Sequence, residues 1–317
     1  MVLNFNNLKN ITLKKSLLYI LLIEMLFVSC EKKIDFKIKD KERKIVINSL
    51  LSSDSLIRAN ISKSMHILDS YSKLQFLTNA IVEIWENDSM LEILSHRKDG
   101  NYYSENIIPI EGDRYKIIAR CEGLKEASSE IIMPYKVPIA NKSAMISEGD
   151  SEIQCSIDFN DPANLENFYL FKVRSHIVFR YYSESEGWEY ESYEGELFID
   201  TNEPIVDDYS FTNEGIIFND NWFDGESYNF TFNIDSYSLY DTSTVYFNLY
   251  SINKEYYQYL RSKELQNWFE DDPFSEAVQV FSNINDGIGI LAGSTLSEDS
   301  IEIIIPTASE PDNPYYK

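Results

Sequence analysis

Positive charge is scarce in this sequence of 317 residues. Lys and Arg together number 28 against 52 Asp and Glu, which leaves a formal charge of −24. Without residues 1–29, Lys plus Arg falls to 25 and Asp plus Glu to 51, so the charge becomes −26. Because a phosphate backbone is bound by clustered positive charge, this balance excludes nucleic acid as a partner.

Catalytic signatures are also missing. His66, His96 and His176 stand alone, and the sequence contains neither an H-E-x-x-H nor a G-x-S-x-G pattern. Carboxylates are so abundant that no pair stands out as the acid and base of a glycosidase. Residues 287–292 fit G-x-G-x-x-A, but a strand follows instead of the helix that a dinucleotide site needs, which predicts a structural turn or edge segment. The sequence therefore predicts no enzyme, no catalytic residue and no cofactor.

Long apolar runs are confined to the N-terminus. Three lysines precede the apolar residues 16–28, and Cys30 follows directly after Ser29. This order predicts a lipoprotein signal peptide over residues 1–29 and acylation of Cys30, with a plain signal peptide or anchor helix as the alternative. Residues 30–43 then form a lipidated tether. The seven basic side chains of residues 31–44 indicate either a solvated linker or attraction to anionic lipid head groups.

Cysteine is nearly absent, with three residues in the whole chain. If Cys30 carries lipid, Cys121 and Cys155 remain, each within a strand-like run. An exported protein meets an oxidising compartment, so the two could form a disulfide. A small buried thiol is equally normal in a strand, and both alternatives stay open.

The rest of the chain is typical of a mostly β fold. Short runs of β-branched and aromatic residues alternate with Asn-Asp, Asp-Gly and Gly-Asp turn signals, which predicts an immunoglobulin-like or transthyretin-like sandwich over residues 44–138. The prolines of residues 134–138 mark a boundary, because proline removes a ladder donor. A larger antiparallel β domain follows over residues 139–317, with one helix at about 254–269 that Asn253 can cap.

Residues 181–253 are the most unusual part of the chain. They contain 16 Asp or Glu and 19 aromatic residues, but no Lys, Arg or His. Strand alternation buries about half of such side chains, so some aromatics should stay exposed between carboxylates and contact a ligand or partner. The alternative is that they pack onto the domain's own core. The candidates, which lie at or near turns, are Trp188, Tyr193, Trp222 and Phe223.

A weaker candidate is a cation site at Asp158, Asn160 and Asp161. Clustered oxygen ligands suit calcium, but Pro162 occupies a ligand position of the usual loop spacing and no glycine follows. Turn formation by Asn and Asp is the favoured interpretation of this segment, so no metal is predicted.

The order of several segments resembles one protein family. After the lipidation signal come IVINSLLSSDS (45–55), DFNDPANLENFYLFKV (158–173) and FNDNWFDGESYNFTF (218–232), and after the helix PFSEAVQVFSNINDGIGILAG (273–293). This order resembles the Bacteroidota outer-membrane lipoproteins known as domain of unknown function 4249, and SNINDGIGILAG is its most specific piece. The resemblance implies an accessory role beside a TonB-dependent outer-membrane transporter, and it supplies no catalytic residues.

The leading hypothesis is therefore a non-catalytic binding protein that is lipid-anchored to the outer membrane and captures or gates a ligand beside such a transporter. A surface adhesin or structural interaction protein is the alternative, and a carbohydrate hydrolase is a lower-ranked one. No ligand is predicted, and both faces of the outer membrane stay open.

Overall fold

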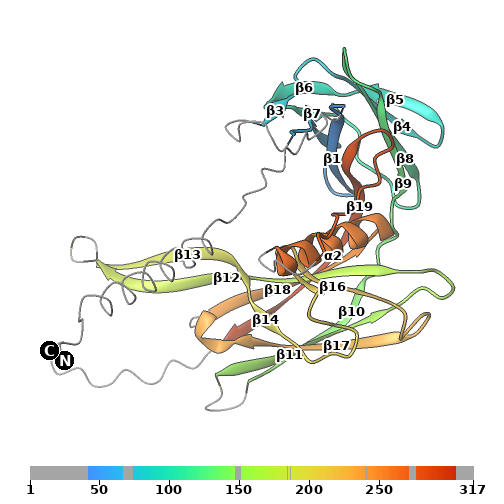
Figure 1. Ribbon diagram of the computed structural model, residues 1–317. Coiled ribbons are helices and arrows are strands. Elements are labelled where there is room, and N and C mark those ends of the chain that lie inside the picture. The colour runs from blue at the N-terminus through green and yellow to red at the C-terminus, as the bar shows by residue number, and fades with distance from the viewer. Residues whose placement is uncertain are drawn as a thin grey trace, which may run out of the picture. The chain divides into compact units, whose positions relative to one another are not determined.

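The computed structural model describes residues 42–66, 74–146, 151–183, 185, 187–239, 242–270 and 276–304. The signal segment, Cys30 and the tether up to residue 41 lie outside these residues, so the predictions about them stay predictions. No helix of the described residues is long and apolar enough to cross a membrane. From Glu42 onward the chain forms a single compact unit, built almost entirely of strands (Figure 1).

An eleven-stranded sheet runs through this unit. Its main path is β15 (Phe211–Thr212), β16 (Gly215–Asn219), β12 (Phe168–Ser183), β18 (Thr242–Ile252), β19 (Ile288–Ile304), β1 (Ile45–Ser52), β2 (Arg58–Lys63), β7 (Asn101–Tyr103) and β6 (Ser95–Lys98). Off this path, β13 (Gly187–Leu197) pairs with β12 and β3 (Gln75–Phe76) pairs with β2. β1 and β19 pair in parallel, and the other described strand pairs are antiparallel.

The N-terminal part is a sandwich, as predicted. A second sheet, in the order β5 (Ser89–Ile93), β4 (Ile81–Glu86), β8 (Arg114–Arg120) and β9 (Ala127–Ile132), packs on the β1, β2 and β7 portion of the long sheet. Alternation decides which side chains face inward. In β8, Tyr115, Ile117 and Ala119 are fully buried, and the alternate positions carry the basic side chains of Arg114, Lys116 and Arg120 together with Ile118.

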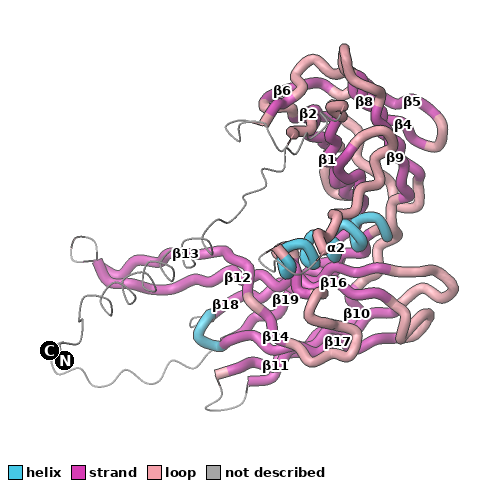
Figure 2. Tube along the Cα trace, viewed as in Figure 1, coloured by secondary structure: helices cyan, strands magenta, loops and turns pink. Residues whose placement is uncertain are grey.

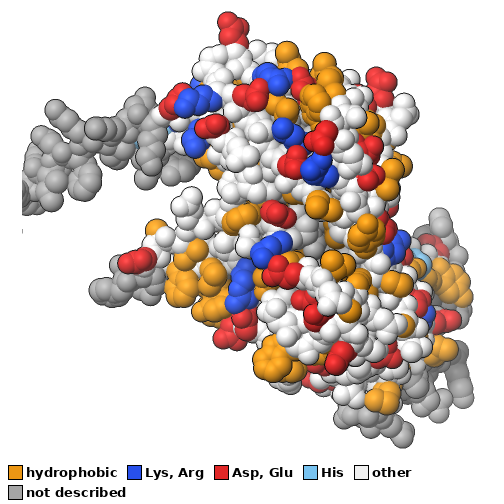
Figure 3. Space-filling model, turned by 90° about the vertical axis from the view of Figure 1, so that its right-hand side faces the viewer, with side chains coloured by type: hydrophobic (Ala, Val, Ile, Leu, Met, Phe, Trp, Pro, Cys, Tyr) orange, Lys and Arg blue, Asp and Glu red, His pale blue; other side chains and the backbone are white. Residues whose placement is uncertain are grey.

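The outer face of this second sheet carries interleaved charges. Arg120 pairs with Glu83 and with Glu126, and Arg114 pairs with Asp88 at 2.5 Å. Figure 3 shows acidic, basic and apolar side chains interspersed over the N-terminal sandwich. Surface ion pairs of this kind stabilise a fold only weakly, so we assign them to solubility rather than to binding.

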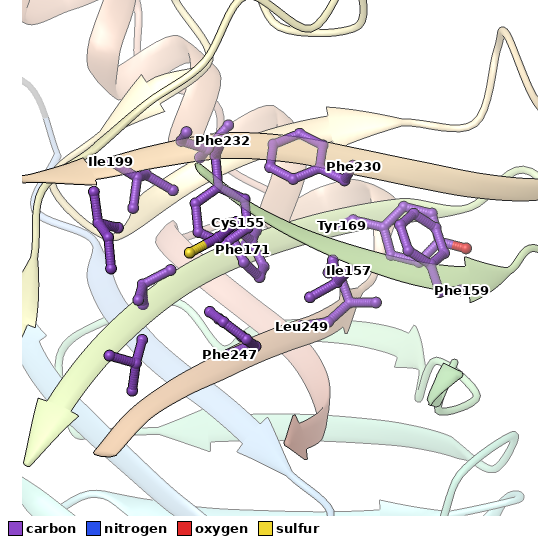
Figure 4. Packing of buried hydrophobic residues seen from close by; sticks show 14 of the residues in the cluster. Cys155, Ile157, Phe159, Tyr169, Phe171, Ile199, Phe230, Phe232, Phe247 and Leu249 are labelled. Atoms are coloured by element: carbon purple, nitrogen blue, oxygen red, sulfur yellow. The ribbon is translucent and has the colours of Figure 1, made fainter. Parts of the chain in front are cut away.

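The C-terminal part is a second sandwich that uses the other half of the long sheet. Its partner sheet runs β10 (Ile139–Ile146), β11 (Glu152–Asn160), β17 (Ser227–Asp235) and β14 (Ile199–Asp200), and a 3-10 helix, η1 (Ser236–Ser238), follows β17. The two sheets enclose an aromatic core in which Phe171 from β12 meets Phe230 and Phe232 from β17 (Figure 4). Prolines 134 and 138 thus separate two sandwiches, although both sandwiches share one sheet.

The helix α2 (Lys254–Phe269) confirms the prediction for residues 254–269. It covers the opposite face of the long sheet from the aromatic core, where Tyr256 and Leu260 pack with Phe168 and Leu170 of β12. β12 is therefore buried on both faces along its first residues. Asn253 precedes the helix but does not cap it with its side chain, because its Oδ1 accepts a hydrogen bond from the Gly293 N–H at 3.0 Å.

The glycine-rich segment near residue 289 leads from a turn, in which the Gly287 N–H donates to the Ile284 carbonyl at 3.4 Å, into β19. Residues 288–293 pair with β1 on one side only, because the pairing of β19 with β18 begins at Ser294, so the prediction of a structural turn or edge segment agrees with the structure. Gly289 has a φ of +111° and lies directly against the Ile47 carbonyl, so no Cβ fits there. Nearby, the Asn283 side chain accepts from the Leu291 N–H at 2.9 Å and donates to the Leu291 carbonyl at 2.8 Å.

Residues 277–281 form no strand, although their apolar residues are typical of one. These residues run extended along α2, and the Phe281 N–H donates to the Ser262 hydroxyl at 2.8 Å. The backbone of this β-branched run forms hydrogen bonds with side chains of a helix instead of with a neighbouring strand. In contrast, residues 300–304 do form a strand, as the end of β19.

Candidate functional site

Two loops of the C-terminal sandwich are joined by hydrogen bonds. Residues 161–167 connect β11 to β12, and residues 220–226 connect β16 to β17. The Asp161 N–H donates to the Glu226 carbonyl at 3.0 Å, and the Asp220 N–H donates to the Asn167 carbonyl at 3.2 Å. We call residues 161–167 and 220–226 the loop pair. Its two halves come from separate segments of the family resemblance, which the fold brings together.

Three carboxylates gather in the loop pair. One carboxylate oxygen from each of Asp161, Asp220 and Asp224 lies within 4.8 Å of the other two. Asp161 and Asp220 are buried, with 6% and 3% of their surface exposed, whereas Asp224 is exposed. Two acidic side chains in the interior require compensation, because burial disfavours an ionised group.

Hydrogen bonds supply part of that compensation. The donors are the Tyr169 hydroxyl and the Gly225 N–H (3.0 Å) for Asp161, the Asn167 N–H (2.7 Å) for Asp220, and the Asn164 N–H (2.9 Å) for Asp224. Burial raises the pKa of Asp161 and the pKa of Asp220, and these hydrogen bonds oppose the rise. Burial also raises the pKa of Tyr169, so its hydroxyl stays protonated and donates at physiological pH.

Carboxylate oxygens are the ligands that calcium and other hard cations take. Among the described residues, Asp161, Asp220 and Asp224 could supply such ligands together. The same three carboxylates already accept hydrogen bonds from N–H groups of both loops, however. The arrangement accounts for how the loops hold each other, and it does not by itself assign a ligand.

The structure does not bring the weaker candidates Asp158, Asn160 and Asp161 together as one oxygen set. Asp158 and Asn160 point from the same face of β11, and Asp158 accepts a hydrogen bond from the Asn229 side chain at 2.5 Å. Asp161 follows the end of the strand and is free of its alternation, so its side chain turns into the loop pair. The sequence does not identify Asp220 and Asp224, because only the aromatic residues of FNDNWFDG (218–225) stand out as candidates.

The loop pair predicts a specific pH dependence. The folded-state pKa of Asp161 is raised, so its contribution to stability is present below its ordinary pKa and is lost as pH rises through the raised value. Asp161→Asn removes this loss. The difference in melting temperature, variant minus natural protein, should therefore be more positive at pH 7 than near pH 3.5.

Asp207→Asn is the matched control with the opposite sign. Arg261 of α2 donates two hydrogen bonds to Asp207, at 2.6 and 3.0 Å, and thereby lowers the pKa of that carboxyl. The stability that it contributes is present above its ordinary pKa and is lost as pH falls through the lowered value. Asp207→Asn should thus destabilise most at pH 7. Thermal melts at both pH values compare the two variants, and parallel profiles would contradict the pKa directions.

The four aromatic candidates do not form one site. Trp222 lies in the loop pair and is 77% exposed, whereas the neighbouring Phe223 is 3% exposed. Phe223 packs against Tyr228 with a centroid distance of 4.3 Å, so the prediction that it forms a contact surface is wrong. Tyr193 is 61% exposed on β13. The side chain of Trp188 lies outside the described residues.

A cleft opens at the base of β13. Along one edge, β12 pairs with β16 before Lys172 and with β13 after it. A cleft of about 340 Å³ lies between β16 and β13 at this point. Phe198 lines this cleft and is 83% exposed. Lys172 lies 3.4 Å from a Glu214 oxygen and 3.7 Å from a Glu196 oxygen, so its charge is already neutralised. No sequence pattern predicts this cleft, because it forms only where β13 and β16 pair with the same edge of β12.

Both described cysteines are free, and the alternative of a buried free thiol holds for Cys155. Cys155 is fully buried in the aromatic core, and burial raises its pKa to about 12 (Figure 4). Cys121 is half-buried against the N-terminal core. The two thiols belong to different cores, which explains why they do not pair.

Two sandwiches on one shared sheet, with a hairpin at its margin and a clamped loop pair, define a β-sandwich protein with an acidic, aromatic surface. The chain belongs to the family described as a domain of unknown function (DUF4249), whose family model matches residues 31–300. A comparison with curated proteins finds no match.

Solved structures similar to this chain include two of β-glucuronidase from Parabacteroides merdae. One, with glycerol in its active site, is 11% identical over 67% of this chain and 23% of its own, with a TM-score of 0.22. The other is 10% identical over 67% of this chain and 24% of its own, with a TM-score of 0.23. This chain thus spans about a quarter of the length of those proteins, and a likeness at this level carries no argument about activity.

Proposed function

We propose that this chain is a lipid-anchored, non-catalytic binding protein of the outer membrane that works beside a TonB-dependent transporter. The exposure of β13 is the observation that carries the binding role. Tyr190 and Tyr193 are 73% and 61% exposed, and Glu191 is exposed between them. Exposed aromatic faces suit an apolar partner surface or a sugar ring, and carboxylates favour cationic or hydroxyl groups and repel anions.

The proposed location is supported by the N-terminal sequence. A basic start, an apolar run and Ser29-Cys30 have the order of a lipoprotein signal, and a tether with seven basic residues over positions 31–44 follows. Lipid chains and basic residues together give firmer membrane attachment than either signal alone. The transporter as partner is supported by the resemblance to outer-membrane lipoproteins of this family.

The non-catalytic role is supported by how the titratable groups are used. His96 packs against the Tyr102 ring with a centroid distance of 5.1 Å, and neither His96 nor His176 forms an ion pair within the described part of the chain. The buried aspartates Asp161 and Asp220 accept hydrogen bonds from loop N–H groups. These hydrogen bonds hold the two loops together.

Co-purification tests this proposal. Full-length protein with a C-terminal tag, extracted from the membranes of its own host in mild detergent, is expected to recover a TonB-dependent barrel in near-equal amount. Cys30→Ser should leave uncleaved precursor, abolish partitioning into the detergent phase and lose the barrel. Cys121→Ser is the matched control and should behave like the natural protein, because that thiol is free and does not belong to the signal sequence.

Two outcomes contradict the proposal. Recovery of the lipoprotein alone across growth conditions would remove the transporter as partner. Normal maturation and membrane fractionation of the Cys30→Ser variant would remove the lipid anchor.

A further inference from the structure

β13 is an edge strand with an open side. It pairs with β12 from Ser183↔Gly187 to Val173↔Leu197, and no other described strand pairs with it. Beyond Val178, β12 has no second neighbour among the described strands, so the end of the hairpin is a two-stranded ribbon (Figure 1, Figure 2). An isolated two-stranded ribbon is marginally stable in water, which favours the addition of a further strand.

The side chains of β13 are exposed on both of its faces. The five consecutive residues from Tyr190 to Glu194 are all exposed, although alternate residues of a strand point to opposite faces. Nothing in the described chain covers either face there. Exposed edges are usually protected by lysine or proline, and β13 contains neither. It carries four glutamates instead, at positions 189, 191, 194 and 196.

The charge of the chain selects the partner of this edge. Residues 139–317 contain 34 Asp or Glu against 8 Lys or Arg, whereas residues 44–138 contain 13 against 11. Like charges on facing positions of two strands are destabilising, so a second copy of this chain would bring glutamate against glutamate. A strand with cationic side chains meets the opposite situation, because the exposed Glu191 and Glu194 gain partners across the new strand pair.

We propose that β13 is the docking edge for an extended, lysine- or arginine-bearing strand of a partner protein, which adds to the sheet beside β13. The outward N–H and C=O groups of β13 would give affinity, and its glutamates and tyrosines would select the cationic strand. This inference rests on the proposed binding function and names the edge through which it acts.

A peptide assay tests the docking edge directly. The probe is a labelled peptide of 11 residues, the length of β13, that consists of lysine and valine with lysines on both faces of the strand, and the full chain in mild detergent is titrated into it at low salt. We expect saturable binding of the lysine peptide and none of the matched glutamate peptide. N-methylation of alternate peptide bonds should weaken binding by about tenfold, because it removes the ladder donors and leaves the charge.

Charge reversal on the protein distinguishes binding at the edge of β13 from binding that depends only on the overall negative charge of the chain. The double change Glu191→Lys and Glu194→Lys should weaken the lysine peptide by about tenfold and create binding of the glutamate peptide. The matched control, Glu105→Lys with Glu122→Lys, changes the net charge equally on exposed positions of the N-terminal sandwich. It should leave both affinities close to those of the natural chain.

Three results would overturn the docking edge. They are equal weakening by both double variants, undiminished binding of the N-methylated peptide, and dimerisation of the full chain that the β13 variant abolishes. Failure here is distinct from failure of the transporter partner. If the barrel co-purifies but the lysine peptide does not bind, the proposed function stands without this edge. If the peptide binds as stated and no barrel is recovered, the edge stands with a different partner.

Discussion

Gly289→Ala is expected to lower the free energy of unfolding by about 3 kcal/mol or more. Gly289 has a φ of +111°, a conformation that strains any residue with a Cβ, and its own position leaves a Cβ no space beside the Ile47 carbonyl. The backbones of β1 and β19 would have to separate where they pair. Urea unfolding followed by tryptophan fluorescence measures the loss, with lower soluble yield as a second readout.

Gly123→Ala is the control that isolates the clash. Gly123 also has a positive φ, of +77°, but a Cβ there would meet nothing within 4 Å. This variant should therefore lose only the backbone strain, about 1 kcal/mol. If the two variants lost similar stability, close approach of β1 to β19 would not explain the glycine.

The second large effect is expected at Phe223. Phe223→Ala should cost about 3–5 kcal/mol, because it empties a buried aromatic position and leaves a cavity. Its ring contacts Phe159 edge-on, with a centroid distance of 5.8 Å, and packs beside Tyr228 and Tyr169. The midpoint of urea unfolding measures the loss.

The adjacent Trp222 is the matched control. It is 77% exposed, so Trp222→Ala should change stability by no more than about 0.5 kcal/mol. Reduced capture of the transporter by that variant, at unchanged stability, would assign Trp222 to a contact surface. A loss for Trp222→Ala as large as that for Phe223→Ala would instead assign both side chains to packing.

The sequence predicted local structure well where a single segment determines it. The helix at residues 254–269 depends on its own periodicity, and strands such as β8 and β17 depend on their own alternation. β19 failed this test because its first half is buried on both faces and rich in small residues, so it shows no period of two. The parallel pairing of β19 with β1 joins segments that are far apart in the sequence, and local patterns do not encode such a pairing.

The candidate sites show the same division. Asp161 attracted attention through its own loop, yet its partners Asp220 and Asp224 come from another loop that only the folded chain brings near. For neighbours such as Trp222 and Phe223, composition predicts that some aromatics are exposed but not which ones. The choice depends on the turn that ends at Gly225, where the Phe223 N–H bonds to the Asp220 carbonyl and directs the Phe223 ring inward. The open edge of β13 required the sheet order itself.

The parallel pairing of β1 with β19 also constrains how the chain reaches its native state. Val46 pairs with Ile288, so one of the first strands cannot complete its ladder until nearly the whole polypeptide has emerged. Contacts this distant in sequence carry a large loop-closure cost and slow folding, and β1 remains without this neighbour meanwhile. A chain with this topology stays incompletely folded while its N-terminal part is already outside the ribosome. That delay suits a polypeptide that must thread a translocation channel before it folds, and it exposes the chain to chaperones and proteases until residue 304 arrives.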